Sequence, residues 1–516
     1  MTSKGAIAAG HPETARAAAA ILADGGNAFD AALAGLCAAC VAEPVLISLG
    51  GGGFLLARRT GGEAVLYDFF AQTPKLRRTE AEVEFFPIVA DFGTAQQEFH
   101  IGMGSIATPG TVKGLFRVHR DLGSMPMARI VEPAAALARD GFRVDRLLAY
   151  IFRIVGKIYG GNAACRAVFG SREHPGELMG EGEVFTLPAF ADTLEALARE
   201  GEDLFYRGDI ARTVIEDCRT SGGTLTGADL EGYEVALRTP LELAYGGARL
   251  FTNPPPASGG ILIAFALELL KEADLAAAGF GSAAHLERLA RSMALTNKAR
   301  IESRLHESDA PESLLDPAFL DAYRRQILGR PAARHGTTHI SVIDAAGNTA
   351  SLSVSNGEGS GYLIPGTGIM LNNLLGEDDI NPHGFHRWPV DERMCSMMAP
   401  TVVVEADGAT AALGSGGSNR IRTAILQVLL NLLEFGMSIE DAVARPRIHF
   451  ENDLLSIEDG FDPDELAAVS KIFPNTEMWE EKNLFFGGVH SVRFDADAGR
   501  FDGAGDLRRG GVALIV

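Results

Sequence analysis

The segment 337–356 constrains the fold most, because it predicts a β-hairpin. Two runs of alternating residues rich in valine, isoleucine and threonine, 339–343 and 349–355, flank a Gly-Asn turn at 347–348. Such a pattern is typical of two antiparallel strands joined by a tight turn. If the loop centres near Ala346, the pairing places Thr337 opposite about Ser355. The sequence therefore predicts two hydroxyl side chains that meet at the open end of one hairpin.

Gly336 precedes this threonine, and the pair predicts a chemical step. Glycine permits a strained backbone in which the Thr337 hydroxyl can reach the preceding carbonyl. An N-to-O acyl shift and hydrolysis of the resulting ester would free the Thr337 amine, which could then act as general base for its own hydroxyl. Taken alone, Gly-Thr-Thr at the start of a strand is an ordinary structural feature, since threonine favours strands.

A second motif supports the first. The segment 414–420, Gly-Ser-Gly-Gly-Ser-Asn-Arg, leads into a run with helical spacing of apolar residues at 421, 425, 428, 429 and 432. Ser418 or Asn419 would cap that helix. A glycine-rich turn at a helix start offers backbone N–H groups to a developing oxyanion. A phosphate loop is the weaker interpretation, because its lysine is missing, and a plain tight turn is the other alternative.

Composition and charge narrow the class of protein. The chain has 516 residues, 47% of them hydrophobic, and can bury a large core as about three domains or as one large layered domain. The 67 acidic against 46 basic residues give a net charge of -21, which disfavours nucleic acid and anionic membrane surfaces as partners.

Cysteine usage and the apolar runs indicate the compartment. Five cysteines in 516 residues fit a reducing environment. Cys37 and Cys40 lie in an alanine-rich run, 31–42, and are interpreted as core residues of a buried helix rather than a redox pair. That run is too short to span a membrane, and no secretion signal is evident, so we expect a cytoplasmic protein.

The coarse pattern is helices first and strands last. Helices are predicted at 13–23, from Asn27 to before Pro44, at 127–140 and at 189–199, whereas short alternating runs dominate the last third. We therefore expect a layered α+β sandwich.

Five blocks resemble the γ-glutamyltranspeptidase family of N-terminal nucleophile hydrolases, and the likeness covers nearly the whole chain. They are DGGNAFDAA at 24–32, LGGGGF at 49–54, PPPASGG at 254–260, Thr337-Thr338-His339, and GAGD at 503–506. The resemblance implies a four-layer αββα sandwich, made as a proenzyme that is cleaved between Gly336 and Thr337. Residues 1–336 would form the large segment and 337–516 the small one, both within one αββα unit.

The resemblance also assigns roles. Thr337 matches the family nucleophile, and Ser355 falls where a second threonine supports it. Gly417 and Ser418 match the paired glycines of the oxyanion hole, or Gly416 and Gly417 after a shift of one residue. The implied substrate-binding residues are Phe70, Asn356, Glu377 and Ser396.

The departures from the family pattern fall on substrate recognition. Phe70 stands where the family has an arginine for the glutamyl α-carboxylate, and Met397 replaces one of two serines that serve the same group. In the segment 372–379, Glu377 could still receive an ammonium group, whereas Leu374 could not. Loss of the arginine and several hydrogen bonds would cost roughly 3 kcal/mol, or a hundredfold in preference.

We therefore expect a self-processing enzyme that cleaves γ-glutamyl amides of the glutathione type through an acyl-enzyme on Thr337, and passes the acyl group to water or an amine. The alternatives are an amidohydrolase of a non-glutamyl acyl amide and an unprocessed relative that only binds. No cofactor is expected, and no metal, since His335 and His339 have no third ligand nearby. Glu392 and Arg393 are interpreted as a pair at the surface or behind the site. The expected partners are a small-molecule amide and the chain's own two fragments as a heterodimer.

Overall fold

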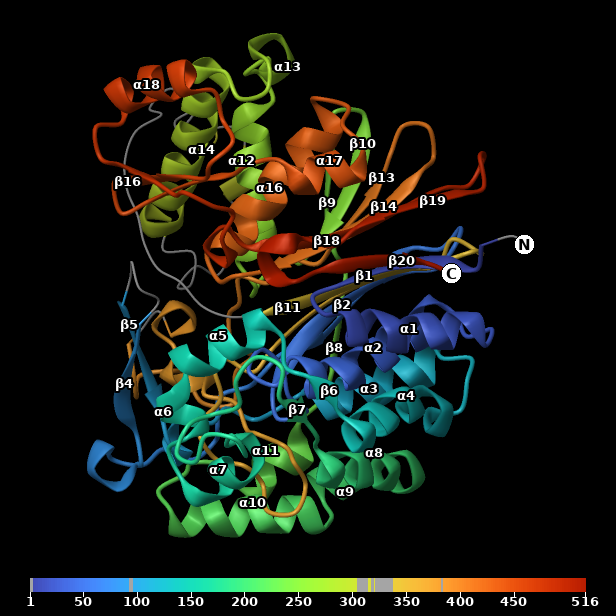
Figure 1. Cartoon of the computed structure of the whole chain (residues 1–516), viewed down its shortest axis with the longest axis vertical. Coiled ribbons are helices and arrows are strands. Elements are labelled where there is room, and N and C mark those ends of the chain that lie inside the picture. Colours follow the sequence, from blue (N-terminus) through green and yellow to red (C-terminus); the bar gives the residue numbers. More distant parts are fainter. Residues whose placement is uncertain (1–2, 92–95, 304–313, 317–319, 321–336, 382–383) are drawn as a thin grey trace.

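Two stacked antiparallel sheets form the centre of the molecule (Figure 1). The computed structural model describes residues 3–91, 96–303, 314–316, 320, 337–381 and 384–516. The first sheet has the order β20-β1-β11-β12-β2-β3-β8, and the second has the order β19-β18-β14-β13-β10-β9. The strands of the first sheet are β1 (Gly5–Ala9), β2 (Gly52–Arg58), β3 (Ala64–Phe69), β8 (Ala236–Arg238), β11 (Thr338–Asp344), β12 (Thr349–Ser355) and β20 (Val512–Ile515). Those of the second are β9 (Leu241–Tyr245), β10 (Ala248–Thr252), β13 (Thr401–Val404), β14 (Thr410–Gly416), β18 (Gly488–Asp495) and β19 (Arg500–Ala504).

Helices cover the outer face of each sheet, so that the order of layers is αββα (Figure 1). The first sheet is covered by α1 (Pro12–Ala23), α2 (Ala28–Ala42) and α3 (Thr111–Leu122), with α4 (Met127–Asp140) and α8 (Pro188–Glu200) beyond them. The second sheet is covered by α12 (Gly259–Leu270), α16 (Arg420–Leu433) and α17 (Ile439–Ala444), with α14 (Ala283–Glu302) packed on α12. The predicted four-layer α+β sandwich is confirmed.

Smaller elements extend the two helical layers. The remaining helices are α5 (Arg146–Ile154), α6 (Gly156–Tyr159), α7 (Ala163–Phe169), α9 (Asp203–Tyr206), α10 (Asp209–Thr220), α11 (Gly227–Gly232), α13 (Leu275–Ala278) and α18 (Pro463–Ile472). The remaining strands are the hairpin β4 (Phe86–Asp91) and β5 (Gln96–Ile101), the pair β6 (Phe142–Arg143) and β7 (Val184–Phe185), and the small sheet β15 (Ile448–Glu451), β16 (Leu454–Ile457) and β17 (Thr476–Met478).

Helix α2 shows how local sequence sets the layers. The side chain of Asn27 accepts hydrogen bonds from the backbone of Phe29 and Asp30, and the Asp30 carboxylate accepts one from the Asn27 N–H. This capping box starts the helix at the predicted residue. Every residue of α2 is buried, as expected for an alanine-rich helix that packs closely on both sides. Cys37 and Cys40 are free thiols within it, and burial raises the pKa of Cys37 to about 12, so the interpretation as core residues is confirmed.

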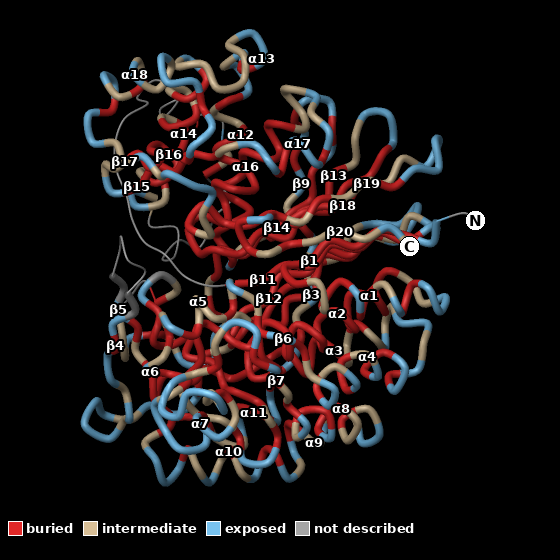
Figure 2. Tube along the Cα trace, in the orientation of Figure 1, coloured by how far each residue is buried: buried red, intermediate tan, exposed pale blue. Residues whose placement is uncertain are grey.

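The predicted hairpin is formed by β11 and β12. Thr338 pairs with Val354, and the register continues to Ile343 opposite Thr349. Because side chains alternate along a strand, Ile340, Val342 and Leu352 belong to the core that includes α2, and the intervening residues point toward the second sheet. Figure 2 shows the deep burial of this region between the layers.

Each sheet contains strands from both sides of position 337. In the first sheet, β11 and β12 lie between β1 and β2, and in the second, β13 pairs with β10. Two fragments divided before Thr337 would therefore share both sheets. Among the helices of the described residues, none has the length and apolar character needed to cross a bilayer.

Candidate active site

Thr337 and Ser355 lie at the open end of the β11–β12 hairpin, as the sequence predicted. The register that pairs Thr338 with Val354 brings Thr337 next to Ser355. Both residues share the strand face of His339 and Ser353, which is turned toward the second sheet. Both are 4% exposed and line the same pocket. The Ser355 hydroxyl oxygen accepts a hydrogen bond from the Gly357 backbone at 3.1 Å. Gly336, the other residue of the predicted cleavage site, lies outside the described residues.

The glycine turn at 416–418 lies against the nucleophile candidate. Gly416 ends β14, and a Cβ added there would stand 1.8 Å from the Thr337 carbonyl oxygen, so only glycine allows this approach. Gly417 has φ of 119°, which other residues rarely adopt. Ser418 follows with φ of 53° and lines the pocket. A strained non-glycine residue beside a pocket is typical of functional sites.

Helix α16 begins directly after this turn. Asn419 occupies the predicted cap position, but its side chain makes no capping bond and instead donates to Glu451 at 3.2 Å. The prediction of the helix start was correct, whereas Asn419 does not cap the helix with its side chain. The first N–H groups of the helix donate instead to backbone carbonyls of the turn.

One pocket of about 340 Å³ gathers most of the predicted site. Its polar lining residues are Thr337, Ser355, Glu377, Ser396 and Ser418. Its apolar lining residues are Phe70, Leu374, Ile380, Met397, Met398 and Ile421. These residues come from the segment after β3, the β11–β12 hairpin, the segments before β13 and after β14, and the start of α16, so only the folded arrangement brings them together.

Three of the four predicted substrate-binding residues line the pocket, and one does not. Phe70, Glu377 and Ser396 contribute to its wall. The Ser396 hydroxyl accepts a hydrogen bond from the Met398 backbone at 3.1 Å and keeps its own proton to donate. Asn356 is fully buried outside the lining, and neither polar atom of its amide has a partner among the described residues. Gly416 and Gly417 also lie behind the pocket rather than in its wall.

No basic side chain lines the pocket within the described parts of the chain. Arg393 lies behind Phe70 and donates to the Phe70 carbonyl and the Tyr233 hydroxyl. Its guanidinium also stands 3.7 Å from Asp68, which is fully buried. Arg393 thus supports the loop that carries Phe70, and it does not replace the arginine that the family pattern predicts there.

His339 lies between the two sheets, where its ring makes hydrogen bonds with neighbouring side chains. Its ring nitrogens contact the hydroxyls of Ser353 and Ser341 at 2.8 and 2.9 Å. Burial holds the pKa of His339 well below its usual value, so the ring is neutral at ordinary pH. Within the described residues, no group of three or more histidine, cysteine, aspartate or glutamate side chains is arranged to hold a metal ion.

Sequence reasoning missed two buried charges beside Thr337. The Glu43 carboxylate, at the end of α2, accepts hydrogen bonds from Thr338 at 2.6 Å and Thr14 at 2.8 Å. Arg509 donates to the Thr337 carbonyl at 3.3 Å. Arg509 follows the block at 503–506 that carried the family resemblance, and this was the available signal. Glu43 offered none, because it stands 294 positions before Thr337.

A four-layer αββα fold, with a threonine at the start of a central strand beside a second hydroxyl and a glycine turn, defines the class of N-terminal nucleophile hydrolases. Comparison with known proteins narrows this class. The sequence model of the family described as Gamma-glutamyltranspeptidase matches residues 14–516. The glutathione hydrolase proenzyme of Escherichia coli (strain K12) is 31% identical, over 95% of this chain and 87% of that protein.

Two acylases are also similar. The Acylase ACY 1 proenzyme of Pseudomonas sp. (strain SE83) is 29% identical over 100% of this chain and 94% of its own length. The crystal structure of cephalosporin acylase from Bacillus halodurans has the same fold, with a TM-score of 0.84 and 24% identity, and covers 99% of this chain and 96% of that one. The chain belongs to the gamma-glutamyltranspeptidase family and is an enzyme of the N-terminal nucleophile hydrolase type.

Proposed function

We propose that this enzyme cleaves itself before Thr337 and then cleaves amide bonds through an acyl-enzyme on the Thr337 hydroxyl. The observation that carries the proposal is the juxtaposition of Thr337, Ser355 and Ser418 in one buried pocket. After cleavage, the free α-amine takes the proton of the hydroxyl as the oxygen attacks the substrate carbonyl. The same proton then passes to the departing amine, and an ester of Thr337 remains.

Water or a second amine completes the reaction by attacking that ester. The α-amine again accepts a proton from the attacking group and returns it to the Thr337 oxygen. Backbone N–H groups of the turn at 416–418 stabilise the oxyanion in both steps, and Ser355 orients the nucleophile by a hydrogen bond. The names of both curated relatives describe proenzymes, which supports a mature heterodimer of the fragments 1–336 and 337–516.

The first substrate class is a γ-glutamyl amide of the glutathione type. The similarity to the Escherichia coli glutathione hydrolase supports it. Glu377 lines the pocket and is suited to receive the α-ammonium group of a glutamyl chain. The enzyme would then hold the amine end of the glutamyl group by charge and leave its carboxylate to weaker contacts.

A second candidate class, acyl amides without a carboxylate, is favoured by a specific observation. Six of the pocket-lining residues are apolar, and Phe70 and Met397 occupy positions where the family pattern has groups for the α-carboxylate. A carboxylate in this wall would lose hydration without gaining a cation, which is costly. An apolar acyl chain would instead gain by burial.

Four p-nitroanilides that differ only in the presence of the amine and the carboxylate separate these classes. γ-Glutamyl carries both the amine and the carboxylate, glutaryl lacks the amine, 4-aminobutyryl lacks the carboxylate, and butyryl lacks both. The first class predicts that kcat/KM is highest for γ-glutamyl, and the second predicts that 4-aminobutyryl or butyryl exceeds it by tenfold or more. Turnover of none of the four would count against both substrate classes.

Intact-mass measurement of the purified protein tests maturation separately. Fragments that end at Gly336 and begin at Thr337 are expected. A single species of 54.7 kDa after long incubation would overturn the proposal of self-cleavage.

A further inference from the structure

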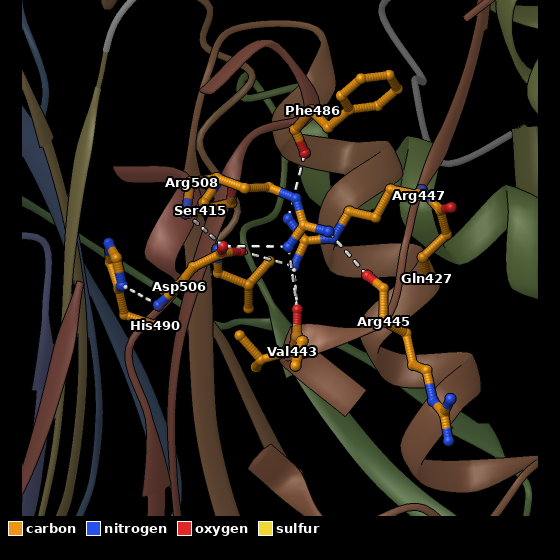
Figure 3. Close-up of polar contacts among 12 residues, drawn as sticks. Ser415, Gln427, Val443, Arg445, Arg447, Phe486, His490, Asp506 and Arg508 are labelled. Atoms are coloured by element: carbon orange, nitrogen blue, oxygen red, sulfur yellow. Dashed lines mark hydrogen bonds and ion pairs between the residues drawn. The ribbon is translucent and has the colours of Figure 1, made fainter. Parts of the chain in front are cut away.

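Three arginines, Arg447, Arg508 and Arg509, lie close to the turn at Asp506. The first two, labelled in Figure 3, are paired with carboxylates. Arg447 binds Asp506 at 2.7 Å, and Arg508 binds Asp506 at 3.1 Å and also Glu458. The four groups are buried, and backbone carbonyls of Val443, Arg445 and Phe486 accept further hydrogen bonds from the two guanidinium groups. Each of these two charges is therefore compensated inside the protein.

The third arginine, Arg509, is buried without such compensation. Arg509 is only 8% exposed. No carboxylate of the described residues lies within 4 Å of its guanidinium. Among the described residues, the Arg509 side chain makes one hydrogen bond, from Nη1 to the Thr337 carbonyl, and its Nε, like that of Arg447, has no partner. Burial lowers the pKa of Arg509 to about 10, so the guanidinium still carries its charge at neutral pH.

The paired cluster holds the turn from which Arg509 extends. The Asp506 carboxylate accepts from the backbone of Val489 at 2.9 Å and of Arg508 at 3.0 Å, and the Asp506 N–H donates to His490 at 3.2 Å (Figure 3). The Asp506 carbonyl accepts from Arg509 and Gly511 at 3.1 and 2.9 Å. The backbone of Arg509 is thus fixed relative to β18.

The guanidinium of Arg509 lies between the two parts of the proposed catalytic machinery. On one side it bonds to the Thr337 carbonyl. On the other, a Cβ added to Gly416 or to Gly417 would lie 3.1 Å from one of its terminal nitrogens. Arg509 is absent from the pocket lining, so its position serves the nucleophile and the glycine turn rather than the acyl group.

A buried charge without an ion pair is costly, and an apolar side chain could fill the same volume at less cost. Such a charge marks a functional role when it adjoins a reactive group. We propose that Arg509 is a positioning residue, which holds the Thr337 carbonyl against the glycine turn and whose positive charge keeps the liberated Thr337 amine neutral and ready to accept a proton. This inference rests on the proposed function, because it concerns the same amine.

Other charged or titratable groups lie on the elements packed around Arg509 and Thr337. They are Glu43 at the end of α2, His11 before α1, His339 on β11, Glu358 after β12, Glu377 in the pocket wall, Arg420 at the start of α16, His490 on β18, and Asp506 in the turn of Arg509.

Three acidic groups, Asp506, Glu43 and Glu358, interact electrostatically with Arg509. The Glu43 side chain already accepts hydrogen bonds from Thr338 and Thr14, and Asp506 is already paired with Arg447 and Arg508. The Arg509 side chain donates a hydrogen bond directly to the Thr337 carbonyl. A cation so placed disfavours the ammonium form of a neighbouring amine.

The unmodified, processed enzyme provides the first test. Competitive acetylation with acetic anhydride over a range of pH, read by mass spectrometry of the fragment that begins at Thr337, measures the pKa of its amine. We expect a pKa below the ordinary range of about 7.7–8.0 for an α-amine. A pKa within or above that range would overturn the proposal without any variant being needed.

Two substitutions and a matched control provide the second test. Arg509→Gln removes the charge, so the acid limb of the kcat/KM profile, and the pKa from acetylation, should move up by roughly one pH unit. Arg509→Lys keeps the charge and should keep the limb within a few tenths of a unit, while kcat falls because the guanidinium hydrogen bond to the Thr337 carbonyl is lost. Arg493→Gln removes an equal charge on β18, where Arg493 pairs with Glu405, and should leave the profile unchanged.

Identical pH profiles for the wild type and Arg509→Gln would refute the electrostatic role. The proposed function fails by a different result, namely an active or processed Thr337→Ala protein. The two failures are therefore distinguishable in one set of preparations.

Discussion

The β11–β12 hairpin has two faces that differ in chemistry although they belong to the same two strands. The helix-side face, formed by Ile340, Val342, Leu352 and Val354, packs into the core that includes α2. The inter-sheet face, formed by Thr337, His339, Ser341, Ser351, Ser353 and Ser355, is buried against the second sheet. One face thus has the composition of a core, and the other is almost entirely polar.

Hydrogen bonds to the second sheet offset the cost of burying the polar side chains of the inter-sheet face. Ser341 donates to the His490 carbonyl and Ser351 to the Leu413 carbonyl, both at 3.0 Å. These bonds tie the first sheet to β18 and β14 through side chains rather than through apolar packing alone. Buried polar groups with partners cost little and fix geometry. We infer that the helix-side face mainly stabilises the fold, whereas the inter-sheet face mainly orients Thr337 and Ser355.

The largest expected effect is the loss of processing and activity on substitution of Thr337, which belongs to the inter-sheet face. Thr337→Ala should abolish processing and lower activity by at least roughly ten-thousandfold, because both the nucleophile and the self-cleaving hydroxyl are lost. The free energy of unfolding should change by no more than about 1 kcal/mol from the unprocessed form. A gel with one band near 54.7 kDa, together with urea denaturation, checks both statements. Appearance of the two fragments would contradict the prediction.

The opposite outcome is expected on the helix-side face. Leu352→Ala removes a fully buried side chain and should lower the free energy of unfolding by about 2–5 kcal/mol. Activity per folded molecule should remain, since Leu352 does not reach the pocket. Leu352→Met is the matched control and should cost less than about 1.5 kcal/mol. Loss of activity without loss of stability would erase the distinction between the faces.

A smaller effect is expected at Ser355. Ser355→Ala should lower kcat by roughly tenfold to a hundredfold, since one hydrogen bond to the nucleophile is lost. Ser355→Thr retains the hydroxyl and should restore most of the rate. Steady-state kinetics on processed enzyme provide the measurement, and equal rates for the alanine and threonine variants would show that the hydroxyl has no such role.

The smallest effect concerns pH. Because burial depresses the pKa of His339, the unfolded chain binds a proton there that the folded chain does not. Stability is therefore complete above the ordinary pKa of about 6.5 and is lost as the pH falls below it. His339→Gln should reduce the slope of unfolding free energy against pH, below pH 6.5, by up to about 1.4 kcal/mol per unit. The exposed His174→Gln serves as control and should leave the slope unchanged.

The periodicity of the sequence was sufficient to predict several helices and strands of the fold. Asn27 marked the start of α2, and the alternating run around Gly347 marked the hairpin and its register, because both depend on neighbours within a few residues. The family resemblance predicted the αββα layers and most of the polar residues that line the pocket. Phe70, Glu377 and Ser396 reach that pocket as expected, whereas Asn356 lies outside its lining.

Contacts between residues far apart in the chain could not be predicted from the sequence. Nothing in the local pattern indicates that Glu43 binds Thr338, or that Arg509 reaches the Thr337 carbonyl. Arg393 was interpreted as part of a pair with Glu392, and its contacts with Phe70 and Tyr233 become visible only when β3 and the segment before β13 are placed together. The apolar character of the pocket likewise depends on Ile380 and Ile421, which come from separate elements.

The sequence by itself therefore determined the hairpin, the hydroxyl pair at its mouth and the glycine turn before α16, since each is encoded by adjacent residues and by backbone preferences. Only the tertiary structure decided which charges surround Thr337 and what the pocket wall is made of. Those properties depend on burial and on distances between residues hundreds of positions apart, and the free energy of a buried charge is set by the groups that the fold places beside it.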